Sequence, residues 1–508
     1  MKKYLNLFDF SQKVNYRTEI LSGLTVALAL VPEAIAFAFI AGLSPLTGLY
    51  AAFVMGLVTS ILGGRPGMIS GATGAVAVVI VSLAKEYGVE YVFATVVLAG
   101  IMQMLAGFLR LGKLMRLVPH PVIFGFVNGL AVIIFMSQMS QFKTPDGDWL
   151  TGSTMLIFLG LVLLTMLIIW GLPRLTKVIP ASLAAILVVF GIVFFFGLDT
   201  RTIGDIASIQ GTFPPFHIPD LPFTWETLQI IFPFAAIVAG VGLIESLLTL
   251  NIVDEITETR GRGNKEAVAQ GTANILSGLF SGMGGCAMIG QSLINTSNGA
   301  RARLSGIFAS IMLLVFIMFG SSLIEKVPMA ALTGLMIMVA LGTFEWASLK
   351  TFRRMPKSDV LVMVLVTLVT IFLHNLALAV LVGVIISALV FAWDNAKRIR
   401  ARKYTDEDGV KHYEIYGPLF FGSTTLFAEK FDVLNDPEEV VIDFAESRLV
   451  DMSAIEAVNK ITERYRKVGK KIHLKHLSRD CKRLLANADA IIEVNVLEDP
   501  TYKVAVDN

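Results

Sequence analysis

The chain has 508 residues, of which 55% are hydrophobic and only 16% are charged, and its mean hydropathy is +0.70. These values exclude a soluble globular protein, and the net charge of +2 gives no indication of nucleic-acid binding. Apolar runs of transmembrane length fill residues 19–393, and a polar tail follows. The composition therefore predicts a polytopic α-helical protein of the cytoplasmic (inner) membrane with a soluble C-terminal domain.

About fourteen apolar segments follow one another along the chain. A short N-terminal segment, 1–18, precedes a transmembrane domain over 19–395, and a basic linker, 396–403, leads to the tail domain, 404–508. The predicted segments are 19–41, 45–62, 68–84, 92–109, 119–139, 152–172, 181–197, 227–250, 264–281, 285–297, 300–323, 328–341, 359–374 and 375–393.

Basic residues before the tail are distributed unequally between the two sides of the membrane. If the N-terminus is cytoplasmic, the lysines and arginines that fall on outside loops are only Lys85, Lys143, Arg201 and Lys326. The positive-inside rule requires this asymmetry. An odd number of spans would place the basic linker outside. We therefore expect both termini in the cytoplasm, with the loops at 142–148 and 199–220 outside.

The stretch 281–295, SGMGGCAMIGQSLIN, cannot form an ordinary membrane-spanning helix. It contains several glycines, and each costs about 1 kcal/mol in a helix interior. A helix over 285–297 would rise only about 18 Å, against a hydrocarbon core of about 30 Å. We therefore expect a half-helix that begins inside the membrane. The alternative is a glycine-rich packing face between two helices.

The first turn of such a half-helix would offer backbone N–H groups that have no partner within the helix. We expect these donors around Cys286, Ala287, Met288 and Ile289. They lie at the positive end of the helix dipole, where an anion is stabilised. Many secondary transporters hold an anion at mid-membrane in this way.

A weak internal repeat places a second break in the N-terminal half of the chain. A shift of 215 residues superimposes Ser70–Gly74 on Gly285–Ile289, so the two broken segments coincide. Seven spans followed by seven more have opposite orientations, because seven is an odd number. The sequence therefore predicts a 7+7 inverted-repeat transporter fold with two half-helices whose N-termini meet near the midplane.

Two acidic residues lie inside apolar segments. Glu33 follows Pro32 in the first span, and Glu245 lies within the eighth. A carboxylate in a span costs about 2.5–3.5 kcal/mol, so it normally faces a partner or an aqueous cavity. The alternative for each is a buried hydrogen-bond anchor. Phe37 shares a helix face with Glu33, where simple packing is the alternative to a role in binding.

A cation site is a further expectation at the second acid. Thr249 follows Glu245 by one turn, so both side chains face the same side of the helix. With backbone carbonyls near Ala287 and Ile289, they would form a site for Na⁺, whereas Glu245 alone would suit a proton. We expect no other cofactor. No nucleophile–base arrangement, HExxH, P-loop or CxxC pair is present in the sequence, so no enzyme is predicted.

The tail is predicted to form a small α/β domain. The patterns indicate strands at 440–444 and 471–477 and helices at 453–467 and 479–488. Ser453 begins the pattern S-x-x-E with Glu456, which predicts a capping box. The lysine-rich stretch 460–483 is either a solvated face or a contact for anionic lipid or a partner.

The order of these motifs resembles the SulP (sulfate permease) family of anion transporters with a C-terminal STAS domain. The motifs are VPEAIAFAFIAGLSPLTGLY, SGATGAVAVV, IESLLT, GGCAMIGQSLIN and DMSAIEA, and they extend over essentially the whole chain. The resemblance implies that a core of spans 1–4 and 8–11 moves against a gate of spans 5–7 and 12–14. It also implies a homodimer.

The resemblance further implies roles for particular residues. Positions that line the anion site in the family match Glu33, Phe37, Thr73, Ala287, Met288, Ile289, Gly290 and Gln291. Glu245 and Thr249 match positions that hold Na⁺ in sodium-coupled bicarbonate members. Many members have an arginine where this chain has Gln291, so a cotransported cation becomes the more plausible counter-charge. Ser453 matches a serine that is phosphorylated in STAS relatives, which implies a cytoplasmic regulator.

The sequence therefore predicts secondary active transport of a small inorganic anion of the bicarbonate or sulfate class, driven by Na⁺ or H⁺. Three alternatives stay open at this point: a nucleobase permease of the same fold, an uncoupled anion channel, and a sensor that signals through its tail.

Overall fold

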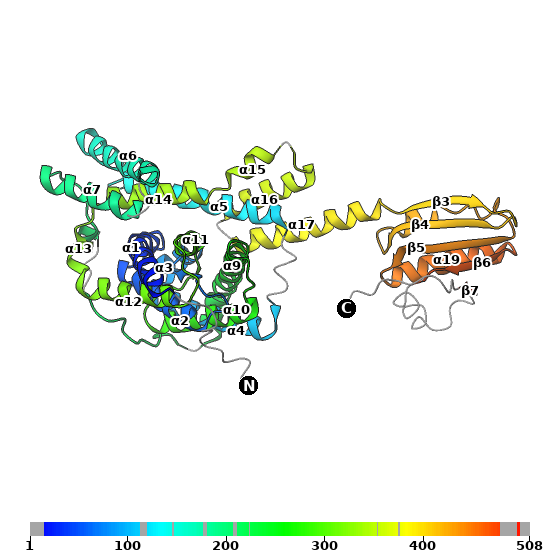
Figure 1. Cartoon of the computed structure of the whole chain (residues 1–508), viewed down its shortest axis with the longest axis horizontal. Coiled ribbons are helices and arrows are strands. Elements are labelled where there is room, and N and C mark those ends of the chain that lie inside the picture. Colours follow the sequence, from blue (N-terminus) through cyan, green and yellow to red (C-terminus); the bar gives the residue numbers. More distant parts are fainter. Residues whose placement is uncertain are drawn as a thin grey trace. The chain divides into compact units, whose positions relative to one another are not determined.

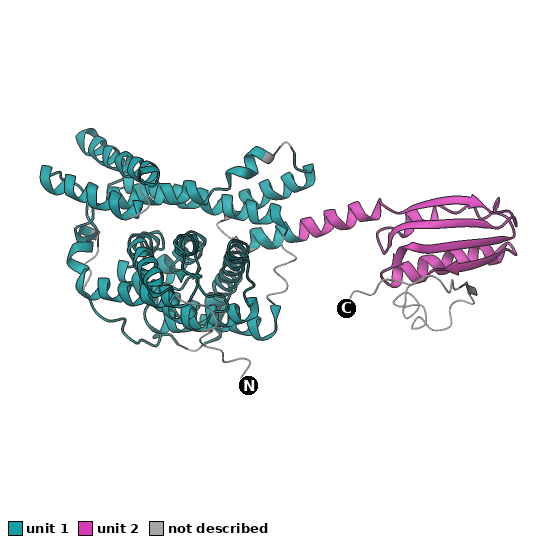
Figure 2. Cartoon of the chain, viewed as in Figure 1, with its two compact units in different colours: residues 1–384 teal, residues 385–508 magenta. Residues whose placement is uncertain are grey.

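The computed structural model describes residues 15–111, 119–144, 147–175, 180–206, 211–222, 224–352, 354–373, 376–477 and 495–497. The chain divides into two compact units, residues 1–384 and 385–508 (Figure 2). Most of the expected N-terminal segment and all of the helix expected at 479–488 lie outside the described residues.

Each apolar segment predicted from the sequence coincides with a helix (Figure 1). In the first half these are α1 (Tyr16–Ile40), α2 (Pro45–Leu62), α3 (Gly74–Tyr87), α4 (Val89–Phe108), α5 (His120–Gln138), α6 (Gly152–Leu175) and α7 (Ala181–Phe196). In the second half they are α9 (Trp225–Thr257), α10 (Gly263–Leu279), α11 (Ile289–Ser297), α12 (Leu304–Phe319), α14 (Met329–Thr343), α16 (Lys357–Leu373) and α17 (Leu376–Ala396).

Short helical turns that the sequence did not predict connect some of these helices. They are η2 (Met139–Phe142), α8 (Ile203–Ile206), α13 (Ser321–Glu325) and α15 (Trp346–Thr351). By length and hydropathy, seven of the described helices could cross a bilayer, namely α1, α2, α4, α5 with η2, α6, α9 and most of α17. Helices α7, α12 and α14 are apolar but shorter.

The helices of the first unit pack as two groups, both visible in Figure 1. In the core group, α4 packs against α9 and α10, and α12 packs against α1 and α2. The half-helices α3 and α11 each contact both α1 and α9. In the gate group, α5 packs against α14 and α16, and α6 packs against α7 and α14. Each group contains helices from both halves of the chain, as the expected inverted-repeat fold requires.

Two short strands cross at the start of the half-helices. β1 (Ser70–Gly71) pairs antiparallel with β2 (Cys286–Ala287), with Ser70 opposite Ala287 and Gly71 opposite Cys286. After β1 the chain enters α3 at Gly74, and after β2 it enters α11 at Ile289, which is the 215-residue shift of the sequence repeat. The two half-helices therefore begin beside the same crossing, as predicted.

Glycine permits the close approach of the two strands. A Cβ atom on Gly285 would lie 1.9 Å from the carbonyl oxygen of Gly71. Gly284 has a φ of +74°, a left-handed conformation that other residues rarely adopt. The amide of Asn274 holds the turn, because it accepts from the N–H of Gly285 at 2.9 Å and donates to the carbonyl of Gly285 at 3.0 Å.

A buried carboxylate joins the first span to the second half of the core group. Glu19 is 2% exposed, and it accepts from the N–H groups of Arg301, Ala302 and Ser305 at 2.7–2.9 Å. Ser305 lies in the first turn of α12, where N–H groups lack partners within the helix, and Arg301 and Ala302 lie just before this helix. The contact therefore holds α1 and α12 together within the core group.

The second unit contains a five-stranded sheet in the order β3-β4-β5-β6-β7. Its strands are β3 (Arg400–Thr405), β4 (Lys411–Leu419), β5 (Glu439–Leu449), β6 (Lys471–Lys475) and β7 (Asn495–Leu497), with helices α18 (Thr424–Ala428) and α19 (Met452–Lys467). β3 is antiparallel to β4, and the other neighbours are parallel. The expected α/β domain is present.

Two details of the tail prediction are wrong. The linker expected at 396–403 is shorter, because α17 ends at Ala396 and β3 begins at Arg400. Ser453 does not cap α19 but is the second residue of the helix. The N-cap is Asp451, whose carboxylate accepts from the N–H of Ala454 at 2.9 Å. The N-cap therefore lies two residues earlier than expected, and an aspartate satisfies one of the N–H groups that lack partners in the first turn of the helix.

The strand crossing generates a stability prediction. Gly285→Ala would push a methyl group into the backbone of Gly71, so we expect a loss of about 1–3 kcal/mol or failure to fold. The measurement is the melting temperature of the purified protein in detergent. The matched control is Gly240→Ala within α9, where no atom lies within 4 Å of the added Cβ. If Gly285→Ala melts like this control, the close strand crossing does not exist.

Candidate functional site

A cavity of about 580 Å³ lies in front of the two half-helix N-termini, between the core group and the gate group. From the core group it is lined by Glu33, Phe37, Thr73, Gly74, Ala75, Glu245, Leu248, Ile252, Met288, Ile289, Gly290, Gln291 and Leu293. From the gate side it is lined by His120, Ile123, Phe124, Phe126, Val127, Leu130, Ile134, Val339, Gly342, Thr343 and Glu345.

The first turns of both half-helices present backbone donors to this cavity. In α3 the first helical hydrogen bond runs from the N–H of Ala77 to the carbonyl of Thr73, and in α11 it runs from Ser292 to Met288. The N–H groups of the preceding helical residues have no helical acceptor. Those on the cavity wall belong to Gly74 and Ala75 in α3 and to Ile289, Gly290 and Gln291 in α11.

The expected position of the donors in α11 was too early in the chain. The helix begins at Ile289, because Cys286 and Ala287 first form β2. The N–H of Ala287 donates to the Ser246 hydroxyl at 3.1 Å, and the N–H of Met288 donates to the carbonyl of Ile69 at 2.9 Å. Of the four residues named from the sequence, only Ile289 has its N–H in the first turn. Met288 lines the cavity, whereas Cys286 and Ala287 are fully buried behind it.

Glycine brings the backbone of both half-helices close to the cavity. Gly290 is exposed, and no atom lies within 4 Å of a Cβ built on it. At the other half-helix, a Cβ on Gly74 would lie 2.9 Å from the ring of Phe37. Phe37 is 4% exposed and therefore packs against the first residue of α3 while it lines the cavity. The start of α11 is therefore open to the cavity at Gly290, whereas the ring of Phe37 lies against Gly74 at the start of α3.

Glu33 is held by a residue of the other repeat. The side-chain amide of Gln291 donates to Oε1 of Glu33 at 2.9 Å, so α11 is tied to α1. Gln291 is only 2% exposed, and its carbonyl oxygen Oε1 has no partner among the described residues. The two side chains form one wall of the cavity.

Glu245 is held by a thiol. Sγ of Cys286 donates to Oε2 of Glu245 at 2.8 Å and lies 3.2 Å from Oγ1 of Thr73. Thr73 is the N-cap residue of α3, and both it and Glu245 line the cavity. Cys286 therefore links a carboxylate of α9 to the start of the first half-helix.

The residues expected to hold a cation are only partly assembled. The hydroxyl of Thr249 donates to the backbone carbonyl of Glu245 at 2.8 Å, and Thr249 is fully buried. Its oxygen keeps lone pairs for a cation, but it does not line the cavity. Of the four expected ligands, Glu245 and Ile289 line the cavity, whereas Thr249 and Ala287 lie behind its wall. In the described part of the chain, no three His, Cys, Asp or Glu residues cluster as metal ligands.

Two titratable residues of the gate side were not predicted. His120 is the first residue of α5, and Glu345 is the N-cap of α15, where its carboxylate accepts from the N–H of Ala347. In the sequence both stand at the ends of apolar segments, where polar residues are ordinary. No local pattern distinguishes them. The cavity wall contains three carboxylates, one imidazole and no lysine or arginine.

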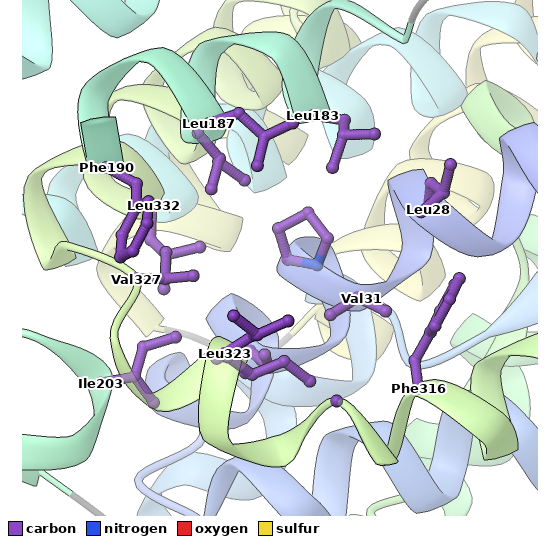
Figure 3. Close-up of a pocket in the computed structure, with 15 residues that line it drawn as sticks. Leu28, Val31, Leu183, Leu187, Phe190, Ile203, Phe316, Leu323, Val327 and Leu332 are labelled. Carbon is purple, nitrogen blue, oxygen red and sulfur yellow. The ribbon is translucent and has the colours of Figure 1, made fainter. Parts of the chain in front are cut away.

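A second cavity of about 250 Å³ lies between α1, α7 and the α12–α14 region (Figure 3). Figure 3 shows Leu28 and Val31 of α1 opposite Leu183, Leu187 and Phe190 of α7. Every side chain that lines it is apolar. This cavity therefore offers an anion no charged or polar side chain.

Comparisons with known proteins agree with this geometry. The sequence profile of the sulfate permease family matches residues 16–146 and 143–367, and that of the STAS domain matches residues 402–500. A Bacillus subtilis protein named "Putative sulfate transporter YbaR" is 44% identical over 93% of this chain and 96% of its own length. The bicarbonate transporter BicA of Picosynechococcus sp. is 30% identical over 88% of this chain and 86% of its own length.

Solved structures show the same fold. The transmembrane domain of a cyanobacterial bicarbonate transporter BicA superimposes with a TM-score of 0.62 at 29% identity, and it covers 74% of this chain and 98% of that chain. The structure of SLC26A9 superimposes with a TM-score of 0.82 at 18% identity, and it covers 96% of this chain and 90% of that chain.

Proposed function

The chain belongs to the sulfate permease family, and we propose that it is a secondary active transporter of a small inorganic anion of the sulfate or bicarbonate class. The observation that carries this proposal is the cavity onto which both half-helix N-termini open. Unpaired N–H groups from two helices converge there, and each terminus carries about half a unit of positive charge. Relatives named as sulfate and bicarbonate transporters support the same substrate class.

We also propose that the anion travels with a cation, Na⁺ or H⁺. The cavity wall has no lysine or arginine, and Glu33 and Glu245 add negative charge whenever they are ionised. The partial charges of two helix termini are then the main attraction for the anion. A cation at Glu245 would remove the nearest repulsion and so raise the affinity for the anion. Linkage requires the anion to raise the affinity for the cation by the same factor.

The proposed setting is the cytoplasmic membrane, with the transporter as a homodimer and both termini in the cytoplasm. The orientation rests on the distribution of basic residues, which favours one side of the membrane. We further propose that the STAS domain receives a cytoplasmic regulator near Ser453, or contacts anionic lipid through its basic face.

Cysteine labelling tests this orientation. Asp148→Cys lies in a loop expected outside, and Arg262→Cys lies in a loop expected inside. A membrane-impermeant maleimide added to intact cells should modify the first and spare the second, and both should react after lysis. The reverse pattern would refute the proposed topology.

Uptake by proteoliposomes tests the proposed function directly. We expect saturable uptake of radiolabelled bicarbonate or sulfate that increases at least several-fold with an inward Na⁺ or H⁺ gradient. A channel would give conductance without dependence on the gradient, and a nucleobase permease would take up uracil instead. Absence of uptake of every anion by folded protein would contradict transport and favour the sensor.

Glu245→Gln tests the site of coupling. Glutamine removes the charge that a cation would neutralise, so we expect gradient-driven uptake to fall to the level without a gradient. Exchange of anion for anion should survive, because the half-helix termini remain. Thr249→Val should weaken a dependence on Na⁺ but not one on H⁺. Full gradient-driven uptake by folded Glu245→Gln protein would show that Glu245 is only structural.

A further inference from the structure

The buried thiol of Cys286 stands between the proposed cation site and the anion cavity. Its Sγ lies 2.8 Å from Oε2 of Glu245 and 3.2 Å from Oγ1 of Thr73. Cys286 is fully buried in β2 and does not line the cavity, whereas Glu245 and Thr73 both do. The thiol therefore touches the two polar groups without being accessible to an anion itself.

The number of available hydrogens determines which group donates in each of these two hydrogen bonds. A thiol has one hydrogen, and here Cys286 donates it to the Glu245 carboxylate. The contact between Sγ and Thr73 therefore uses the hydroxyl hydrogen of Thr73. In this arrangement the Thr73 hydroxyl is turned toward sulfur and offers no hydrogen to an anion in the cavity.

A cation at Glu245 changes which group accepts the thiol hydrogen. Once the carboxylate is neutralised, it attracts the thiol hydrogen much less, because hydrogen bonds to charged acceptors are about twice as strong as those to neutral ones. The thiol can then donate to Oγ1 of Thr73, and the hydroxyl hydrogen of Thr73 becomes free to point into the cavity. Thr73 and the first residues of α3 line that cavity.

We propose that Cys286 is a positioning residue that couples cation occupancy of Glu245 to anion binding at Thr73. This inference rests on the proposed cotransport. In this proposal the thiol binds neither the cation nor the anion. It connects Glu245 and Thr73 through a chain of hydrogen bonds. The other titratable side chains that line the same cavity are Glu33 on α1, His120 on α5 and Glu345 at the start of α15. None of these contacts Cys286 in the described structure.

The hydrogen-bonded residues Thr73, Cys286 and Glu245 come from both repeats. Thr73 belongs to the first repeat, and Cys286 and Glu245 belong to the second. The pairing of Gly71 with Cys286 in the β1–β2 crossing fixes the distance between Thr73 and the thiol. The same crossing that starts the half-helices therefore sets the coupling contact.

The test compares Cys286→Ala, Cys286→Ser and the wild type in proteoliposomes. The measured quantity is the coupling factor, defined as the anion KM without the cation divided by the KM at saturating cation. Cys286→Ala removes the hydrogen bonds of the thiol to Glu245 and to Thr73. We expect the coupling factor to fall roughly two- to tenfold, which is the factor that the net free energy of one hydrogen bond corresponds to. Cys286→Ser keeps a donor and an acceptor, so it should retain most of the wild-type factor.

Controls separate this role from loss of packing. Thr95→Ala removes a fully buried hydroxyl of the core group that does not line the cavity, so it should keep the wild-type coupling factor. Thr73→Val should reproduce the loss seen in Cys286→Ala, and the double variant should add little to it, since both break one chain.

Two results would overturn the inference: an unchanged coupling factor in Cys286→Ala, or equal losses in Cys286→Ser and Cys286→Ala while Thr95→Ala is unaffected. A wild-type protein without any cation dependence would overturn the cotransport proposal as well. That result is distinguishable, because it appears before any variant is made.

Discussion

The antiparallel pairing of β1 with β2 is the contact on which the rest of the transport unit depends. Extended backbone inside a membrane is tolerated only where its polar groups are satisfied by protein or by a water-filled cavity. Here the backbone polar groups of the two strands pair with each other, and side chains bond to neighbouring backbone groups. Asn274 pairs with Gly285, Ser246 accepts from Ala287, and Ser292 accepts from the N–H of Ile69 at 3.0 Å. The N–H groups of Gly74 and Ala75 in α3 and of Ile289 and Gly290 in α11 have no acceptor within their helices, and these residues line the cavity.

The crossing also determines the electrostatics of the site. Two helix N-termini converge on a wall that contains carboxylates and no lysine or arginine. Gln291, in the first turn of α11, is neutral and buried, and its side-chain amide donates to Glu33. In the proposed function, a neutral amide there leaves the partial charges of the two helix termini as the main attraction for the anion. The absence of lysine and arginine from the cavity wall is the physical reason for which we propose that a cation accompanies the anion.

Much of this architecture was predictable from the sequence, because it follows from length, glycine content and charge placement. The half-helix over 285–297 was recognisable because it is too short and too rich in glycine to span the membrane. Its true start at Ile289 was not, because pairing with a strand 215 residues away is a tertiary contact that has no local signal. The same limit applies to Cys286, which looks like an ordinary small apolar residue until Glu245 and Thr73 are placed beside it. In the tail, Asp451 and Ser453 both fit the N-cap preference, and only the helix boundary distinguishes them.

The most direct test of the account is a structure of the purified protein with its transported anion, bicarbonate or sulfate, determined by electron cryomicroscopy at saturating anion and cation. The account predicts anion density between the first turns of α3 and α11, within hydrogen-bond distance of the N–H groups of Gly74 or Ala75 and of Ile289 or Gly290. Density elsewhere in the cavity, with these N–H groups bound only to water, would contradict the claim that the paired half-helices hold the anion.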